Sequence, residues 1–359
     1  MKRHGDLWPA VVSWPNLVRA ADKARRGKRR RDVVLRFDFD LERELLQLRR
    51  ELVGGSYHPG PFTTHWINRP KPRLISAAPY RDRVVHHAVL NVLEPLLDRS
   101  FHPDSYACRR GKGTHAAARR LQRLMRRYPY TLQCDVRKYF PSIDHAVLKD
   151  QFRRLLKDCR LLALMDRIVD SSNDQEPVTA WFPGDDLFTP TTRRKGLPIG
   201  NLTSQWFANW YLTAFDYRIT DKLQFGYVRY CDDFILLSAN RRRLRDVAPA
   251  LVERLAALRL KLHRDRIHVA PSSAGRTFVG YRVSPARHRI GNANVRAFLG
   301  RLGRMRRAFS RRRLSREDVQ QRLMGWLGHA AQADSLSLIA RLASGWVFRR
   351  GRFHSFRRV

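Results

Sequence analysis

The chain has 359 residues, of which 43% are hydrophobic, so it can bury the core of one large or two ordinary domains. Its 71 Lys and Arg residues far outnumber its 32 Asp and Glu residues, which gives a formal net charge of +39. This charge predicts a polyanionic partner, and the lack of any apolar run near the roughly 18 residues of a membrane span excludes an integral membrane protein.

The cysteines and the N-terminus bear on where the protein works. Cys108, Cys134, Cys159 and Cys231 are scattered without CxxC spacing, so neither a disulfide framework nor a zinc site is indicated. The N-terminal segment MKRHGDLWPAVVSWPNL lacks an apolar core followed by a small-residue cleavage site, which argues against secretion. We therefore expect a reducing, cytoplasmic location.

In chain order, residues 1–58 predict a basic and helical N-terminal region. Residues 19–31 carry eight basic residues and one acid, which favours an arm that contacts phosphates over a solvated helix face. Leucines at helical spacing then predict a helix over Asp40 to Leu52, which the sequence GGSYHP ends.

The middle of the chain mixes strands with helices. Because they lack regular βαβ alternation, we predict the α+β fold class. The predicted elements are a strand pair over 62–76, helices over 82–97 and 114–127, a strand over 130–136, a helix over 144–156, a polar Pro-rich loop over 173–195, a helix over 204–223, a hairpin over 225–238, a helix over 244–260 and a strand over 277–284. From Arg296 onward, basic residues and helical spacing predict a helical C-terminal domain.

The hairpin FGYVRYCDDFILLS places two like charges, Asp232 and Asp233, side by side between apolar runs. Turns favour aspartate, so a structural role is a real alternative. A second pair, Asp185 and Asp186 in FPGDDLF, reads as an ordinary loop. The pair in the hairpin therefore indicates a functional site only if other residues of the sequence support it.

A third carboxylate, Asp135, ends the predicted strand YTLQCDV. If that strand and the hairpin are neighbours in one sheet, Asp135, Asp232 and Asp233 converge, and such a cluster is costly unless divalent cations neutralise it. Hard oxygen ligands select Mg²⁺, and two such ions stabilise the attacking and leaving oxygens of phosphoryl transfer. In a basic protein this site predicts a polymerase or a nuclease.

At this point the chain resembles the reverse transcriptases over about residues 60 to 285. YCDDF resembles the YxDD box of that family, LQCDVRKYFPSIDH its first-aspartate motif and RPKPRLISAAPYRDRVVHHAV its fingers motif. Four further blocks follow the family order: SYACRRGKGTHAAARRL, GLPIGNLTSQWFANWYL, LRLKLHRDRI and TFVGYRV. The resemblance implies a right-hand polymerase with fingers, a small antiparallel palm sheet and a basic helical thumb.

The resemblance also implies boundaries and ligands. Residues 59–275 would form the fingers and palm, with the fingers at about 59–129 and 145–196, and residues 276–359 the primer-grip strand and thumb. Asp135, Asp232, Asp233 and the Val136 carbonyl would bind two Mg²⁺ ions, for which Mn²⁺ can substitute. Asp233 is the weakest of the three carboxylates, since its counterpart often points away from the metals.

Other matched positions would bind the incoming dNTP. Lys71 and Arg73 match residues that hold the triphosphate, although a general RNA contact is an alternative. Phe140 matches the steric gate that excludes a 2′-hydroxyl, with plain core packing as the alternative. The remaining matches in the nucleotide pocket are Lys138, Tyr139, Ile199 and Gly200, and Gly280 and Tyr281 match the turn that grips the primer end.

The block GLPIGNLTSQ indicates which kind of reverse transcriptase the chain resembles. Most of the family has Gln at Ile199 and Ser-Pro at Ser204-Gln205, and the IGxxxSQ form resembles the enzymes of diversity-generating retroelements. That implies error-prone copying of a template RNA into cDNA, with a small basic accessory protein as partner. A retron-type or antiviral-defence enzyme, a catalytically idle RNA-binding or maturase-like protein and a nuclease using the same metals remain as alternatives.

Overall fold

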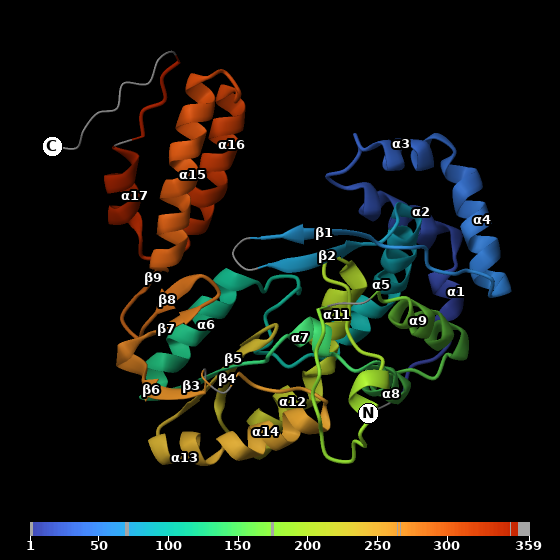
Figure 1. The fold of residues 1–359 in the computed structure, drawn as a ribbon, viewed down its shortest axis with the longest axis horizontal. Helices are drawn as coiled ribbons and strands as arrows, with labels where there is room; N and C mark the ends of the chain where they lie inside the picture. The colour runs from blue at the N-terminus through green and yellow to red at the C-terminus, as the bar shows by residue number, and fades with distance from the viewer. Residues whose placement is uncertain are drawn as a thin grey trace. The chain divides into compact units, whose positions relative to one another are not determined.

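The protein is described by a computed structural model that covers residues 3–68, 72–173, 176–263, 265, 267–344 and 346–350. The chain divides into two compact units, whose elements are labelled in Figure 1. Unit 1 comprises Met1–Arg109, Cys134–Gln224 and Asp246–Ile267, and unit 2 comprises Arg110–Gln133, Phe225–Arg245 and His268–Val359.

Unit 1 begins with helices packed against the long helix α5 (Tyr80–Ser100). Asn16 in α2 is buried and donates to the carbonyls of Val11 (2.9 Å) and Ala88 (3.0 Å), which satisfies its amide inside the core. α4 ends where Gly55 takes a left-handed φ of 74° that glycine adopts at no steric cost. The N-terminal helices are α1 (Trp8–Val11), α2 (Trp14–Arg25), α3 (Asp32–Phe39) and α4 (Leu41–Gly54).

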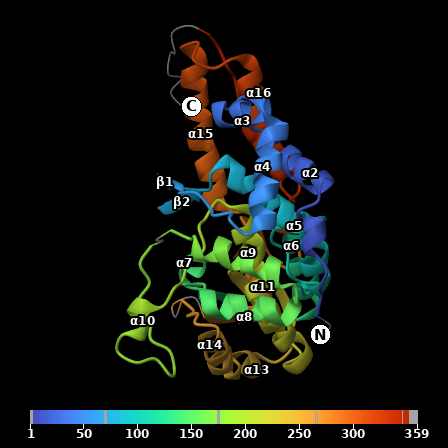
Figure 2. The same cartoon turned by 90° about the vertical axis from the view of Figure 1, so that its right-hand side faces the viewer.

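A two-stranded antiparallel hairpin, β1 (Thr63–Ile67) and β2 (Arg73–Ala77), also belongs to unit 1 (Figure 1). Two of the helices that follow are capped by aspartates: Asp144 accepts from the Val147 N–H and Asp158 from the Leu161 N–H. Figure 2 shows α8, α9 and α11 gathered together. The remaining helices are α7 (Tyr139–Ser142), α8 (His145–Leu155), α9 (Cys159–Asp170), α10 (Thr189–Thr192), α11 (Leu202–Tyr211), α12 (Thr213–Tyr217) and α14 (Ala248–Ala257).

Unit 2 is built around a sheet with the strand order β4-β5-β3-β6. Its strands are rich in fully buried apolar residues, and α6 (Thr114–Arg127) packs on it. The last two residues of β3 fall in unit 1. The strands are β3 (Tyr130–Asp135), β4 (Gly226–Tyr230), β5 (Asp233–Ser238) and β6 (His268–Pro271), and α13 (Arg241–Asp246) follows β5.

The C-terminal part of unit 2 combines a small antiparallel sheet with helices. Phe298 of α15 stacks on Trp326 of α16 with ring centroids 3.8 Å apart, which joins the two long helices that run side by side in Figure 1. The elements are β7 (Arg276–Phe278), β8 (Tyr281–Val283), β9 (His288–Ile290), α15 (Asn292–Ser310), α16 (Arg316–Ala330) and α17 (Leu336–Ala343).

Most predicted elements are confirmed, and others differ from their predicted form. The helix predicted over 204–223 is broken into α11, α12 and a π-helical turn over Arg218–Lys222. The strand predicted over 277–284 is a hairpin, because Val279 and Gly280 reverse the chain with φ of 46° and 89°. Helix α9 and strands β6 and β9 were not predicted, and α2 was predicted only as part of the helical region 1–58. In α2 the buried Leu17, Ala20 and Ala24 keep helical spacing, but mostly through small side chains.

Candidate active site

The segment 197–201 of unit 1 docks on strand β2. The Ser76 N–H donates to the Ile199 carbonyl (2.9 Å), and the Asn201 side chain accepts from the Ala78 N–H (3.1 Å) and donates to the Ser76 carbonyl (2.9 Å). Asn201 is only 3% exposed, so these bonds replace its contacts with water. The segment that carries Ile199 and Gly200 is thereby fixed on strand β2.

Gly200 cannot be replaced freely at this junction. Its φ of 117° lies outside the regions that side chains tolerate, and a Cβ there would lie 3.0 Å from the Ile75 Cγ2 and 3.5 Å from the Ser76 carbonyl oxygen. The close approach of the segment to β2 therefore requires glycine.

The chain that leaves β3 runs from Asp135, a predicted metal ligand, to Phe140, the predicted contact with the sugar. Asp135 accepts through its carbonyl from the His263 N–H (3.0 Å), and the Arg137 N–H donates to Lys261 (2.8 Å). These bonds flank the bridge between Val136 and Leu262, so the N–H and carbonyl of Val136 point away from residues 261–263. This orientation suits the predicted role of the Val136 carbonyl as a metal ligand.

Lys138, Tyr139 and Phe140 follow, and this stretch is hydrogen-bonded to the segment 197–201. Lys138 has a left-handed φ of 46°, which is uncommon for a residue with a side chain. Tyr139 is buried and its hydroxyl donates to the Ala208 carbonyl. The Leu197 N–H donates to the Phe140 carbonyl (2.9 Å), and the Phe140 ring stands edge-on to Tyr139 with centroids 5.8 Å apart.

In unit 2, the acidic hairpin turns at Cys231 and Asp232. Tyr230 pairs with Asp233, and Cys231 takes a left-handed φ of 57°, so Asp232 lies in the turn and Asp233 is the first residue of β5. The fully buried Arg229 donates to the Cys231 carbonyl (3.0 Å), and this hydrogen bond stabilises the turn.

Gln133 of β3 connects this hairpin to the predicted primer grip. Its side-chain amide donates to the Asp233 carboxylate (3.1 and 3.3 Å) and to the Thr277 carbonyl of β7 (3.1 Å). Gln133 and Asp135 lie two residues apart on one strand and therefore share a face of the sheet. No pattern in the sequence singles out Gln133, because its role depends on which strands are neighbours.

Other residues hold the primer-grip turn inside unit 2. The Gly291 N–H donates to the Gly280 carbonyl (3.0 Å). Tyr281 is fully buried, and its hydroxyl lies 2.6 Å from the His115 Nδ1 and donates to the His329 carbonyl (3.1 Å). Burial raises the pKa of the Tyr281 hydroxyl to about 12, so it stays a neutral donor.

The residues predicted for the active site are thus divided between the two units. Unit 1 contains Asp135, Val136, Arg73, Lys138, Tyr139, Phe140, Ile199 and Gly200, and unit 2 contains Asp232, Asp233, Gly280 and Tyr281. Lys71 lies outside the described residues. β3, which ends at Asp135, and β5, which begins at Asp233, are neighbours in the sheet. The convergence of the three carboxylates on one point stays a prediction.

The donor chemistry of these residues fits Mg²⁺, since carboxylates and a backbone carbonyl are the hard oxygen ligands that this ion prefers. Over the described ranges of the chain, no group of three or more His, Cys, Asp or Glu side chains is placed to hold a metal ion. In the same ranges, no helix is long and apolar enough to cross a bilayer.

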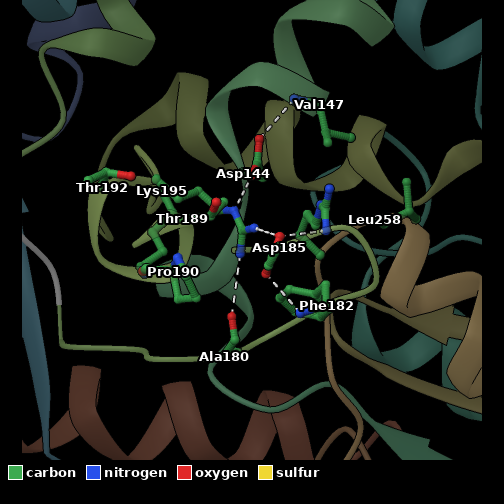
Figure 3. Close-up of polar contacts among 12 residues, drawn as sticks. Asp144, Val147, Ala180, Phe182, Asp185, Thr189, Pro190, Thr192, Lys195 and Leu258 are labelled. Carbon is green, nitrogen blue, oxygen red and sulfur yellow. Dashed lines mark hydrogen bonds and ion pairs between the residues drawn. The ribbon is translucent and has the colours of Figure 1, made fainter. Parts of the chain in front are cut away.

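The second acid pair stabilises its own loop, and Figure 3 shows the surroundings of Asp185. Asp185 accepts from the Phe182 N–H (2.8 Å) and forms ion pairs with Arg193 and with Arg259 (3.0 Å). Burial acts to raise the pKa of the Asp185 carboxyl, but the Phe182 amide and the two arginines lower it. Asp186 caps α10 through the Thr189 N–H. The sequence predicted the loop but not these ion pairs.

Replacing Asn201 with Ala is expected to lower the free energy of unfolding by about 2–4 kcal/mol, because it removes two buried hydrogen bonds, one from the Ala78 N–H and one to the Ser76 carbonyl. Chemical denaturation of both proteins measures the loss. Replacing the exposed Asn240, at the start of α13, should cost about 1 kcal/mol, because it removes only a helix cap that solvent can partly replace. Equal losses for the two variants would contradict the docking role of Asn201.

Comparison with known proteins identifies the family of this chain. Residues 67–283 match the family "Reverse transcriptase (RNA-dependent DNA polymerase)". Protein YkfC of Escherichia coli (strain K12) is 24% identical over 295 residues, which cover 70% of this chain and 74% of YkfC. The group II intron-encoded protein LtrA of Lactococcus lactis subsp. cremoris is 23% identical over 178 residues, which cover 49% of this chain and only 28% of LtrA.

Among solved structures, that of apo telomerase from Candida tropicalis is similar, with a TM-score of 0.46 and 13% sequence identity over 64% of this chain and 48% of that one. The family match covers more than half of the chain and includes the hairpins β1-β2 and β4-β5, strand β3 and the segment 197–201. The chain therefore belongs to the reverse transcriptase family and has its α+β right-hand polymerase fold.

Proposed function

We propose that the protein is an RNA-directed DNA polymerase that copies a template RNA into cDNA. The observation that carries the proposal is the order of the sheet, in which the strand ending at Asp135 lies beside the strand beginning at Asp233. The net charge of +39 supports binding of template RNA and of the primer or cDNA strand. We place this activity in the cytoplasm.

In this proposal, Asp135, Asp232, Asp233 and the Val136 carbonyl hold two divalent cations, Mg²⁺ or Mn²⁺. Bound there, the cations would activate the primer 3′-hydroxyl and stabilise the charge on the leaving pyrophosphate. Lys71 and Arg73 bind the triphosphate of the incoming dNTP. The α-phosphate forms a new bond to the 3′-oxygen as its bond to the bridging oxygen of pyrophosphate breaks.

We propose three functional regions along the chain. We assign residues 1–58 to a basic N-terminal region, residues 59–275 to fingers and palm, and residues 276–359 to the primer grip and thumb. Gln133 supports this assignment, because it bonds to both Asp233 and the β7 strand that precedes the Gly280 turn.

Primer extension on a defined RNA template tests the polymerase. The expected result is cDNA that grows only when dNTPs and Mg²⁺ or Mn²⁺ are present. RNA binding without extension would favour the idle, maturase-like alternative. Cleavage of the nucleic acid without dNTPs would favour a nuclease.

Within this activity we propose the error-prone copying of a diversity-generating retroelement, assisted by a small basic accessory protein. Ile199 and the pair Ser204-Gln205 support it, because they depart from the Gln and Ser-Pro of most of the family. A retron-type or antiviral-defence enzyme is the second candidate. A template and variable repeat pair beside the gene supports the first, and a structured noncoding RNA or a toxin gene supports the second.

Replacing Ile199 with Gln is expected to lower misincorporation opposite template adenine about tenfold, equivalent to about 1.4 kcal/mol of restored discrimination. The backbone of Ile199 is held by Ser76, so the substitution changes only the side chain. An amide can lose a hydrogen bond to a wrong base, whereas an aliphatic side chain cannot.

Sequencing cDNA from both proteins on one template measures this effect. Errors opposite the other template bases serve as the internal control and should fall less. Equal adenine error rates in two active enzymes would leave Ile199 as a packing residue and remove the main sequence reason for an error-prone polymerase.

A further inference from the structure

A small cavity in unit 1 lies under the loop that joins α9 to the segment 197–201. It has a volume of about 90 Å³ and is lined by the loop residues 177–180, Phe182 and Ser142. Six cationic side chains also line it: Arg137, Lys138, Arg193, Lys195, Arg259 and Lys261. All of these residues belong to unit 1, and none of the described residues that line the cavity is acidic.

Carboxylates outside the cavity offset only part of this charge. Asp185 pairs with Arg193 and Arg259, as Figure 3 shows, and Asp144 lies 3.3 Å from the Arg193 Nε. Glu176 pairs with Lys138 (2.7 Å). Three carboxylates therefore face six cations, and the cavity keeps an excess of positive charge.

Three of the six cations gather around one aromatic ring, although the side chains of Arg137 and Lys261 are exposed. The Phe182 ring has Arg193, Arg259 and Lys261 within 5.4 to 5.7 Å of its centroid. The Arg193 guanidinium is 8% exposed and donates to the Ala180 carbonyl (3.4 Å). These contacts fix the charges in place around the cavity before any ligand arrives.

The pKa of the Lys195 ammonium group depends on burial and on the neighbouring charges. Its ammonium group donates to the Pro190 carbonyl (2.7 Å), and Figure 3 shows it beside Asp144. Its pKa is lowered mainly by burial and then by the Arg193 charge, although Asp144 acts in the opposite direction. An anion in the cavity would offset the part of this shift that comes from Arg193 and would relieve the repulsion between the cations.

We propose that this cavity binds a phosphate group. Its volume corresponds to about three water molecules in the liquid, which suits one phosphate rather than a whole nucleotide. Arginine and lysine together provide the donors that phosphate oxygens accept. The phosphate comes either from the backbone of a bound polynucleotide or from free pyrophosphate or inorganic phosphate, and the chemistry of recognition is the same.

The test uses the full chain and a double variant, Lys195→Met with Lys261→Ala. A matched control, Arg218→Ala with Lys222→Ala, removes the same charge from exposed positions of the same unit. A second variant, Lys195→Arg with Lys261→Arg, keeps the charge and reveals any loss that comes from misfolding. Thermal melting of all four proteins checks that they are folded.

Two measurements distinguish the sources of the phosphate. Calorimetric titration with pyrophosphate and with inorganic phosphate, without nucleic acid, should show an affinity that falls about tenfold in the double variant if the ligand is free. Titration of single-stranded RNA over a range of salt should show a log–log slope reduced by about 1.4 for two lost contacts if the ligand is a backbone phosphate. In either case the arginine variant keeps the affinity.

The proposal is overturned if the double variant matches the exposed-site control in both measurements, or if the arginine variant loses as much as the double variant. Neither measurement needs polymerase activity. A protein that binds phosphate here but makes no cDNA would therefore leave this proposal standing while the proposed function fails.

Discussion

Replacing Asp232 with Asn is expected to reduce dNTP incorporation by roughly 10³-fold or more, while the affinity for RNA stays the same or rises slightly. Asp232 lies in the turn of the β4-β5 hairpin, where the buried Arg229 holds the Cys231 carbonyl. The substitution keeps the shape of the side chain and removes only its charge, so the turn should persist. We expect RNA to bind to basic residues, which the substitution leaves intact.

The second acid pair provides the matched control. Asp186→Asn makes the same chemical change in an exposed loop residue that caps α10, and we expect it to leave incorporation within about twofold of the original protein. Single-turnover primer extension and RNA titration are measured for both variants. Near-normal extension by Asp232→Asn, or an equal loss in Asp186→Asn, would contradict a special role of the hairpin carboxylate.

Local patterns predicted much of this fold because the relevant signals lie close together in the sequence. The hairpin β4-β5 is visible as two apolar runs around a short turn, and α6 has the predicted bounds of 114 and 127. The loop over 173–195 was also visible from its polar and Pro-rich composition. In each case the chain needs no distant partner to reveal the element.

The contacts that fix the site could not be predicted in the same way. Asn201 bonds to residues more than 120 positions away, and Gln133 bonds to residues 100 and 144 positions away. Asp185 looked like a common loop aspartate, yet it pairs with an arginine 74 positions further along. A spacing pattern carries no information on such pairs, because they depend on the tertiary arrangement.

The same limit applies to the cationic cavity. Its six basic side chains are scattered from residue 137 to residue 261 in a chain that is basic throughout, so the sequence shows only an excess of charge. The structure adds that these charges surround one small space and that a single aromatic ring, Phe182, lies among them.

Replacing Phe140 with Ala is expected to raise incorporation of ribonucleotides relative to deoxyribonucleotides by about a hundredfold, equivalent to about 2.7 kcal/mol of lost discrimination. The Phe140 ring is partly exposed and stands against Tyr139, whose hydroxyl is tied to Ala208. The carbonyl of Phe140 accepts from Leu197, which leads to the segment at Ile199 and Gly200. The ring is thus held beside the proposed nucleotide pocket, and we infer that it occupies the volume that a 2′-hydroxyl needs.

Phe140→Tyr is the matched control, because it keeps the ring and should keep the discrimination. Steady-state extension with each dNTP and its ribonucleotide counterpart gives the ratio of kcat/KM values that measures the gate. The physical argument predicts that the ribonucleotide value rises while the dNTP value changes little, since only the 2′-hydroxyl meets the ring. If the alanine variant still incorporates dNTPs and discriminates as before, Phe140 is a packing residue. The bulk that excludes ribonucleotides must then come from another side chain of the pocket.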